Sequence, residues 1–373
     1  MAQHVRQPAS WLTTYKAKYR TQLDPFRVIH TGIFTMDLAI GGGLGEGYMH
    51  TFTGWESSGK TSTAWTTIAQ YQKKYPHRRI VVFDCEGRMN QQWAETLGVR
   101  FDAADCEEPK LVVFQTSVCE EIIEIVQQFH DDLDLGLLII DSLAMIKSAE
   151  ELANPGKHNI GITAKRQSDL GHVIMQIQNA RRTDNEALLT CLVMNQLRNK
   201  IGVVYGDPTK TVGSDFFTKY SMVNDIRMSK GKVKELSAAE AKALGLDSNL
   251  DYIEHTFRVQ KTSQALCRKE GAYTRSLREQ TETDYGEVNN ISSILEVAKG
   301  YGYYQGAGKG QYIVGVDEKF STMAAAREYL TKNPYQMDFL AAKCIARARF
   351  EARHEMLPKD RYLYRFWEND FEL

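Results

Sequence analysis

Four short apolar runs recur between residues 48 and 196, and polar residues close each of them. The runs are YMHTFTG, RRIVVFDCEG, LGLLIIDSLA and ALLTCLVMNQ, at residues 48–54, 78–87, 135–144 and 187–196. Each is rich in β-branched, aliphatic or aromatic residues, which is typical of buried parallel strands. Segments with helical spacing lie between them, for example residues 61–75 and 119–130. Strand alternating with helix predicts an α/β fold with a central, mostly parallel sheet flanked by helices.

The residues that close these runs are small, acidic or amide-bearing. They are Gly54 to Lys60, Asp84 to Glu86, Asp141 with Ser142, and Asn195 with Gln196. In an open parallel sheet, ligands bind beyond the carboxyl ends of the strands. These four chain segments are therefore expected to meet in one site.

Changes in composition and in the spacing of apolar residues divide the chain into four predicted parts. Residues 1–30 are polar, basic and aromatic, and their helical spacing fits either a surface helix or an arm that docks on a neighbouring subunit. Residues 31–275 carry the strand and helix pattern of a core domain. Residues 276–340 read as a helix, a Gly/Tyr-rich hairpin and a second helix, which predicts a small α+β domain. Residues 341–373 are helical and basic with an acidic end.

The composition fits one large or two modest globular domains, with 373 residues of which 43% are hydrophobic and 25% charged. The formal net charge is -1, so a nucleic-acid site would have to come from local clusters of basic residues. The six cysteines are scattered without a CxxC pair, which favours reduced thiols over a disulfide framework or a zinc site. No segment reaches the roughly 20 apolar residues that span a bilayer, and a cytoplasmic protein is expected.

The stretch GWESSGKT fits the P-loop pattern G-x-x-x-x-G-K-[ST] and joins a predicted strand to a predicted helix. Its glycines allow successive N–H groups to surround phosphate oxygens at the positive end of the helix. Lys60 would reach the β- and γ-phosphates, and the Thr61 hydroxyl would bind Mg²⁺. The nucleotide-binding candidates here are Gly54, Glu56, Ser57, Ser58, Gly59, Lys60, Thr61 and Ser62.

Two further strand ends supply acids to this predicted site. Asp141 would lie beside the metal, through water, as the second-strand acid of a P-loop protein, although an acidic helix cap is the alternative. Glu86 is a candidate to orient and deprotonate the water that attacks the γ-phosphate. Asp84, two residues earlier, competes for that role.

Taken in order, these motifs resemble those of the RecA recombinases of bacteria and bacteriophages. The resemblance rests on GWESSGKT, VVFDCEG, LLIIDSLA and above all MNQLRNKIGVVYGDPTKTVG, and covers about three-quarters of the chain from Thr31. It implies a RecA-type P-loop NTPase core that uses ATP and Mg²⁺. It also implies a protein of DNA recombination and repair that forms filaments on single-stranded DNA, pairs that DNA with a homologous duplex and exchanges strands.

The resemblance assigns roles to individual residues of the nucleotide site. Glu86 matches the catalytic base, Asp141 the second-strand acid and Gln196 the γ-phosphate sensor. Around the adenine, where the family has an acid and a tyrosine, this chain has Asn90 and Trp93. The family also extends two lysines into the site of the neighbouring subunit. Lys261 matches the first, and Ser263 stands at the second.

Two DNA-binding loops are also implied, near residues 151–167 and 197–213. Each loop of the family inserts an aliphatic side chain between base triplets, and the matching residues are Ile160 and Ile201. Such a wedge replaces lost base stacking without reading the sequence. The residues expected to contact the DNA backbone are Lys165, Arg166, Ser168, Arg198, Lys200 and Gly213. For Lys165 and Arg166 a solvated helix face is the alternative.

Three functional hypotheses follow from the sequence. The first is an ATP-dependent strand-exchange enzyme. The second is a DNA-coating filament protein that binds ATP with little turnover, which Ser263 would permit. The third is a hexameric helicase with the same P-loop core, although a motor domain needs neither the second loop nor the small C-terminal unit.

Overall fold

The computed structural model describes most of the chain, with gaps. The described residues are 27–103, 106–154, 160–182, 187–199, 209–211, 213–214, 217, 221–235, 250–264, 269–277 and 285–356. The predicted N-terminal arm up to residue 26 and the acidic end after residue 356 lie outside this range. None of the helices in the described part of the chain is long and apolar enough to cross a membrane.

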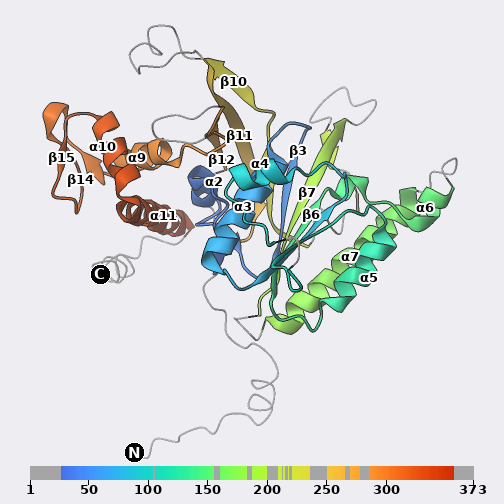
Figure 1. Ribbon diagram of the computed structural model, residues 1–373. Helices are drawn as coiled ribbons and strands as arrows, with labels where there is room; N and C mark the ends of the chain where they lie inside the picture. Colours follow the sequence, from blue (N-terminus) through green and yellow to red (C-terminus); the bar gives the residue numbers. More distant parts are fainter. Residues whose placement is uncertain are drawn as a thin grey trace, which may run out of the picture.

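A large mixed sheet forms the centre of the molecule (Figure 1), with the strand order β10-β11-β9-β3-β7-β6-β4-β5. The parallel strands are β3 (Met49–Gly54), β4 (Arg79–Asp84), β5 (Leu111–Phe114), β6 (Leu135–Asp141), β7 (Thr190–Asn199) and β9 (Met222–Met228). The antiparallel strands are β8 (Thr209–Thr211), β10 (Lys232–Glu235), β11 (Leu250–Thr262) and β12 (Glu270–Ser276). The predicted α/β fold with a mostly parallel sheet is confirmed.

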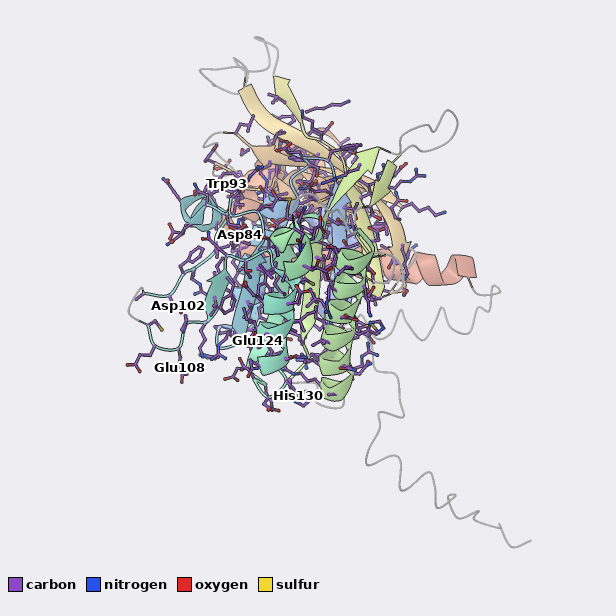
Figure 2. The ribbon with its side chains drawn as sticks, turned by 90° about the vertical axis from the view of Figure 1, so that its right-hand side faces the viewer. Asp84, Trp93, Asp102, Glu108, Glu124 and His130 are labelled. Atoms are coloured by element: carbon purple, nitrogen blue, oxygen red, sulfur yellow. The ribbon has the colours of Figure 1, made fainter. Side chains whose placement is uncertain are left out.

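Helices cover both faces of this sheet, as the alternation of side chains along each strand requires. Ile80 and Val82 of β4 pack in one core with α3 (Lys60–Lys74). Val81 and Phe83 of the same strand pack in a second core with α5 (Cys119–Gln128) and α7 (Ile160–Arg181). Figure 2 shows α5 and α7 side by side over this second face.

The parallel strands end at a common edge, which carries the polar residues that the sequence singled out. Asp84 and Trp93 lie near this edge in Figure 2, whereas His130 lies at the opposite end of the sheet. Several short elements complete this part of the chain. They are β1 (Val28–Ile29), α2 (Phe34–Ala39), β2 (Leu44–Gly45), α4 (Gln91–Thr96), the 3₁₀ turn η1 (Leu143–Met145) and α6 (Ala149–Ala153).

The C-terminal part of the described chain forms a small α+β unit beside the sheet (Figure 1). Its elements are α9 (Asn290–Gly300), β13 (Tyr304–Gln305), the 3₁₀ turn η3 (Gly308–Gly310), β14 (Gln311–Ile313), β15 (Lys319–Phe320), α10 (Met323–Lys332) and α11 (Pro334–Met356). Its apolar core also includes Phe34 and Leu38 from α2. The α+β character agrees with the expectation from the sequence, while the boundaries at residues 275 and 340 stay predictions.

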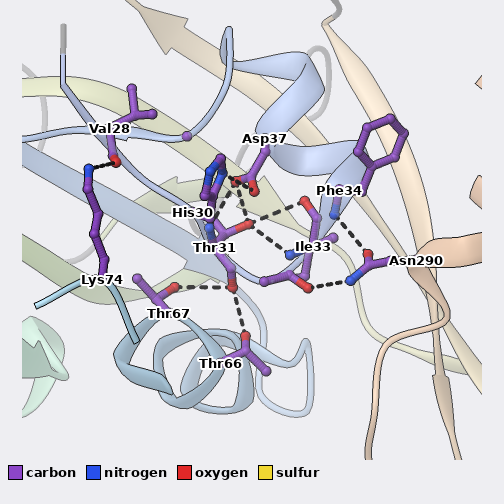
Figure 3. A network of polar contacts seen from close by, with 12 residues as sticks. Val28, His30, Thr31, Ile33, Phe34, Asp37, Thr66, Thr67, Lys74 and Asn290 are labelled. Atoms are coloured by element: carbon purple, nitrogen blue, oxygen red, sulfur yellow. Dashed lines mark hydrogen bonds and ion pairs between the residues drawn. The ribbon is translucent and has the colours of Figure 1, made fainter. Parts of the chain in front are cut away.

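A polar network fixes α2 between the P-loop helix and the C-terminal unit (Figure 3). The Thr31 carbonyl accepts a hydrogen bond from Thr66 of α3 at 2.9 Å, and the Thr31 hydroxyl donates to Asp37 at 2.8 Å. Asn290 at the start of α9 accepts from the Phe34 N–H and donates to the Gly32 carbonyl, both at 2.9 Å. The amide thereby pairs its donor and its acceptor with chain that lies more than 250 residues earlier.

The buried His50 of β3 predicts a pH dependence of stability. Its Nε2–H donates to the Gly45 carbonyl at 2.8 Å and its Nδ1 accepts from Asn224 at 3.1 Å, which fixes a neutral ring. Burial lowers the pKa of His50 to about 4. Because the pKa in the folded state lies below the unfolded value, the stabilisation is present above pH 6.5 and is lost as the pH falls toward 4.

We expect His50 to lower the free energy of unfolding by about 2 kcal/mol between pH 7.5 and pH 5. Urea unfolding at the two pH values measures the difference. His50→Gln keeps a neutral amide at this position and should show a smaller loss on acidification. An equal loss in both proteins would show that another group controls the acid sensitivity.

Candidate functional site

The P-loop leaves β3 at Gly54 and enters α3 at Lys60, as its pattern predicts. Gly54 has no room for a side chain, because a Cβ atom there would lie 2.5 Å from both the Met228 carbonyl oxygen and Ser58 Oγ. Gly59 precedes the helix with a φ of +84°, a left-handed conformation that glycine adopts without strain. This turn directs the first N–H groups of α3 toward the carboxyl edge of the sheet.

The Lys60 ammonium lies over the loop that precedes it. It donates to the carbonyl oxygens of Gly54 and Trp55 at 3.1 and 2.8 Å, and to Ser58 Oγ at 3.3 Å. Burial lowers the pKa of Lys60, while the carboxylates of Asp141 and Glu86 act in the opposite direction. A cation held in this way at the mouth of the loop is suited to binding phosphate oxygens.

The Thr61 hydroxyl and the Asp141 carboxylate form an oxygen pair next to this lysine. Thr61 Oγ1 donates to Asp141 Oδ2 at 2.5 Å. Burial raises the pKa of Asp141 to about 6, although the hydrogen bond from Thr61 favours the ionised form. Hard oxygen ligands of this type fit Mg²⁺, which keeps several waters and takes phosphate oxygens as further ligands.

Among the residues that the structure describes, no group of three or more His, Cys, Asp or Glu side chains could hold a metal ion alone. The Thr61 and Asp141 oxygens would therefore share the ion with the phosphates and water, as a P-loop site requires.

The two acids that compete for the role of base differ in their surroundings. Asp84 is buried, and its two carboxylate oxygens accept the N–H groups of Arg88 and Met89 at 3.3 and 3.0 Å. Glu86 is 22% exposed at its side chain, and its Oε1 accepts from Ser142 Oγ at 2.8 Å. Asp84 is thus occupied in shaping the following turn, and the geometry favours Glu86 as the base.

Gln196 contacts the same carboxylate from a different strand. Its Nε2 donates to Glu86 Oε1 at 2.7 Å. The strand register explains the meeting, because Gly54 of β3 pairs with Gln196 of β7, so the P-loop and this amide begin at one level of the sheet. The residue predicted as sensor thus lies next to the predicted base, and the roles of both stay predictions.

Trp93 lies beside the first turn of the P-loop helix, at the edge seen in Figure 2. Asn90 caps α4 by accepting the Trp93 N–H at 2.9 Å. The Trp93 indole donates to Ser62 Oγ at 3.2 Å and packs edge-on against Tyr285, with ring centroids 5.6 Å apart. Asn90 and Trp93 therefore lie where a base could follow the phosphates, and their contact with adenine stays a prediction.

Lys261 lies on β11, outside the P-loop itself. In the register of the two strands, Lys261 lies opposite Asp225 of β9. The Asp225 carboxylate accepts from Thr53 Oγ1 at 3.1 Å, and burial raises the pKa of Asp225 to about 6. Ser263, two residues further along the chain, is exposed and donates its N–H to the Val223 carbonyl. The action of Lys261 on a neighbouring subunit stays a prediction.

The predicted DNA-contacting residues are described only in part. Lys165 and Arg166 lie exposed on α7, where Arg166 pairs with Glu120 at 3.2 Å and with Asp169 at 3.5 Å. These pairs agree with the solvated-face alternative for Arg166 as well as with a DNA contact. Arg198 is exposed near the end of β7.

The structure describes some of the remaining members of this group and not others. Ser168 and Ser214 have their hydroxyls 2.5 Å apart, and Gly213 has a φ of +101°. Ile160 begins α7, but its side chain lies outside the described part. Lys200 and Ile201 also lie outside the described residues.

Ser142 and Tyr285 are neighbours of the site for which the sequence predicted no individual role. Ser142 donates to the Glu86 carboxylate, and its place directly after Asp141 at a strand end was a usable signal. Tyr285 packs on Trp93 from 192 positions further along the chain, and no local pattern indicates that meeting.

The P-loop after β3, the acid at the end of β6 and the mostly parallel sheet define a P-loop NTPase fold. Residues 17–256 match the family described as the RecA N-terminal domain. This match covers more than half of the sequence, and the chain belongs to the RecA family.

Individual relatives agree with this membership. Protein RecA of Gloeobacter violaceus is 34% identical over 206 residues, which are 54% of this chain and 51% of the relative. Protein RecA of a Nostoc species is 34% identical over 201 residues, 53% of this chain and 52% of the relative. Protein RecA of Streptomyces venezuelae is 34% identical over 211 residues, 56% of this chain and 52% of the relative. The chain spans about half the length of the curated relatives it matches.

Proposed function

We propose that this protein is an ATP-dependent homologous-recombination protein. It polymerises on single-stranded DNA as a helical filament, pairs that DNA with a homologous duplex and exchanges strands, and it hydrolyses ATP in a DNA-stimulated reaction. Family membership supports the class of activity. One contact supports a link between the ATP site and the DNA site. Gln196 touches the predicted base Glu86 and lies on β7, the strand that leads into the predicted second DNA loop.

The arrangement of the site supports phosphoryl transfer to water. Lys60 and the N–H groups at the start of α3 would bind the β- and γ-phosphates and stabilise the charge that develops on them. Mg²⁺, held by Thr61 and Asp141, would neutralise further phosphate charge. Glu86 would orient the attacking water and accept its proton, since its carboxylate is partly exposed and held by Ser142 and Gln196.

A DNA-coating filament protein with little turnover is the second candidate. It is favoured by Ser263, which stands where the resemblance implies a cation from the neighbouring subunit and is exposed on the surface of this chain. Without that cation, less of the transition-state charge would be neutralised across the subunit boundary.

The deciding experiment measures ATP hydrolysis with and without single-stranded DNA and examines the same samples by electron microscopy. The recombinase proposal predicts filaments together with DNA-stimulated hydrolysis. Filaments without turnover would favour the coating protein, and closed rings would favour a helicase.

Gln196→Ala should separate nucleotide binding from DNA stimulation. The change removes the amide that contacts Glu86, so a change at the phosphates would no longer pass from this carboxylate to β7. We expect ATP affinity within about twofold of the original and a loss of about tenfold or more in stimulation by DNA. Titration with a fluorescent ATP analogue and hydrolysis assays measure the two quantities. Full stimulation in the variant would refute the sensor role, and Gln127→Ala on the exposed side of α5 is the control.

A further inference from the structure

A buried glutamine on α7 joins three separate segments near the candidate site. Gln167 is 2% exposed. Its Nε2 donates to the carbonyl oxygens of Leu143 and Ile146, at 3.2 and 3.0 Å. Its Oε1 accepts the N–H of Ser214 at 3.0 Å. Both ends of the amide are therefore used, each toward backbone groups of a different segment.

Each of these segments belongs to a different part of the site. Leu143 and Ile146 form the turn that directly follows Asp141 at the end of β6. Helix α7 begins in the predicted first DNA loop and carries Lys165 and Arg166 one turn or less before Gln167. Ser214 follows the predicted second DNA loop. One side chain thus connects the acid of the nucleotide site with both predicted DNA loops.

Helix α7 contacts the end of the second loop at two places, through Gln167 and through Ser168. A Cβ atom on Gly213 would lie 2.8 Å from Gln167 Oε1, and the φ of +101° at this position also requires glycine. Next to the amide on α7, the Ser168 hydroxyl lies 2.5 Å from the hydroxyl of Ser214. The backbone at residues 213–214 is therefore packed directly against α7.

The chemistry of this position calls for an amide. Its nitrogen serves carbonyl acceptors and its oxygen serves an N–H donor, which no apolar side chain and no carboxylate can do together. An apolar residue of the same size would leave three buried backbone groups without their partner.

We propose that Gln167 is a positioning residue that couples the nucleotide site to the DNA loops. It holds residues 213–214, at the end of the second loop, against the helix of the first loop and against the turn after Asp141, so that a change at one site shifts the others together. This inference rests on the proposed function, because it assumes that ATP binding changes the affinity for single-stranded DNA.

The test compares two glutamines on the same helix. Gln178 is also buried, and its Nε2 donates to the Leu189 carbonyl at 3.1 Å, away from the predicted loops. Gln167→Met and Gln178→Met each remove a buried amide of similar size. The measured quantity is the ratio of dissociation constants for a fluorescein-labelled oligothymidylate without and with a non-hydrolysable ATP analogue and Mg²⁺, by fluorescence anisotropy.

We expect Gln167→Met to reduce this ratio at least tenfold and Gln178→Met to change it less than twofold. Affinity for the ATP analogue alone should stay within about twofold in both variants, because neither side chain reaches the P-loop. Gln167→Glu keeps the acceptor for Ser214 but loses the donor to Leu143 and Ile146, and its ratio should fall between those of the original protein and Gln167→Met.

Two results would overturn the inference while leaving the proposed function intact. One is an equal ratio in Gln167→Met and Gln178→Met. The other, measured on the unaltered protein without DNA and therefore independent of whether a variant folds, is complete hydrogen exchange of the Ser214 amide within seconds, since a buried bond to Gln167 should slow it. A ratio near one in the unaltered protein would instead overturn the proposed function, and the coupling with it.

Discussion

Lys60→Ala should abolish nucleotide turnover, lowering it by about a thousandfold or more. The Lys60 ammonium lies over the loop, where it contacts the carbonyl oxygens of Gly54 and Trp55, whereas the guanidinium of Arg88 pairs with the exposed Glu56 carboxylate at 3.7 Å. Phosphate binding would therefore lose its main cation, and the charge that develops in the transition state would be left to the backbone N–H groups and the metal. Steady-state hydrolysis and titration with a fluorescent ATP analogue measure the two losses.

A second lysine on the same helix provides the matched control. Lys73 lies exposed in the last turn of α3, at the far end from the P-loop. Lys73→Ala removes the same charge from the same helix and should leave turnover within about twofold, because surface charges at that distance are screened by salt. Comparable losses in the two variants would show that helix stability, rather than phosphate binding, explains the effect.

Glu86→Gln should lower turnover by about a hundredfold to ten-thousandfold while ATP still binds. The substituted amide keeps an oxygen that can accept from Ser142 and Gln196, so the local structure is preserved. What it loses is the ability to take a proton from the attacking water. Single-turnover hydrolysis, with ATP affinity measured in parallel, separates the chemical step from binding.

The competing acid gives a contrasting result. Asp84→Asn leaves one of the Arg88 and Met89 N–H groups without its carboxylate oxygen, and the melting temperature should fall, since Asp84 is buried. Glu86→Gln should change the melting temperature little. If Glu86→Gln kept most of the turnover and Asp84→Asn lost it at equal stability, Asp84 would be the base.

The parallel core was predictable because its signals are local. Each of the four runs that were read as strands overlaps a strand of the sheet, although β7 extends three residues beyond its run, and the P-loop pattern falls where β3 meets α3. The polar residues at the strand ends were expected to converge, and the contact between Glu86 and Gln196 shows that two of them do. The strand and helix patterns and the eight-residue P-loop motif are each contained within one short stretch of chain.

The partner of β11 and several contacts of the site could not be predicted from local pattern, because they join residues that are far apart in the sequence. Strand β11 joins the sheet through β9 in antiparallel order, and nothing in its own sequence selects that partner. In the sequence, nothing distinguishes Gln167 from the other polar residues of α7. Its contact with Ser214 is formed only when the two segments pack together in the fold. Asp84 and Glu86 are both carboxylates at the end of the same predicted strand, and their burial and hydrogen bonds distinguish them in the structure.

The shared core of α2 and the C-terminal unit has a consequence for biosynthesis. Phe34 and Leu38 are synthesised about 300 residues before Cys344, against whose cluster they finally pack. At about 5–20 residues per second, the ribosome needs roughly 15–60 s to deliver that partner. Until α9 and α11 have been made, the side of α2 that carries Phe34 and Leu38 lacks its partners in this cluster, so this surface would be open to a ribosome-associated chaperone.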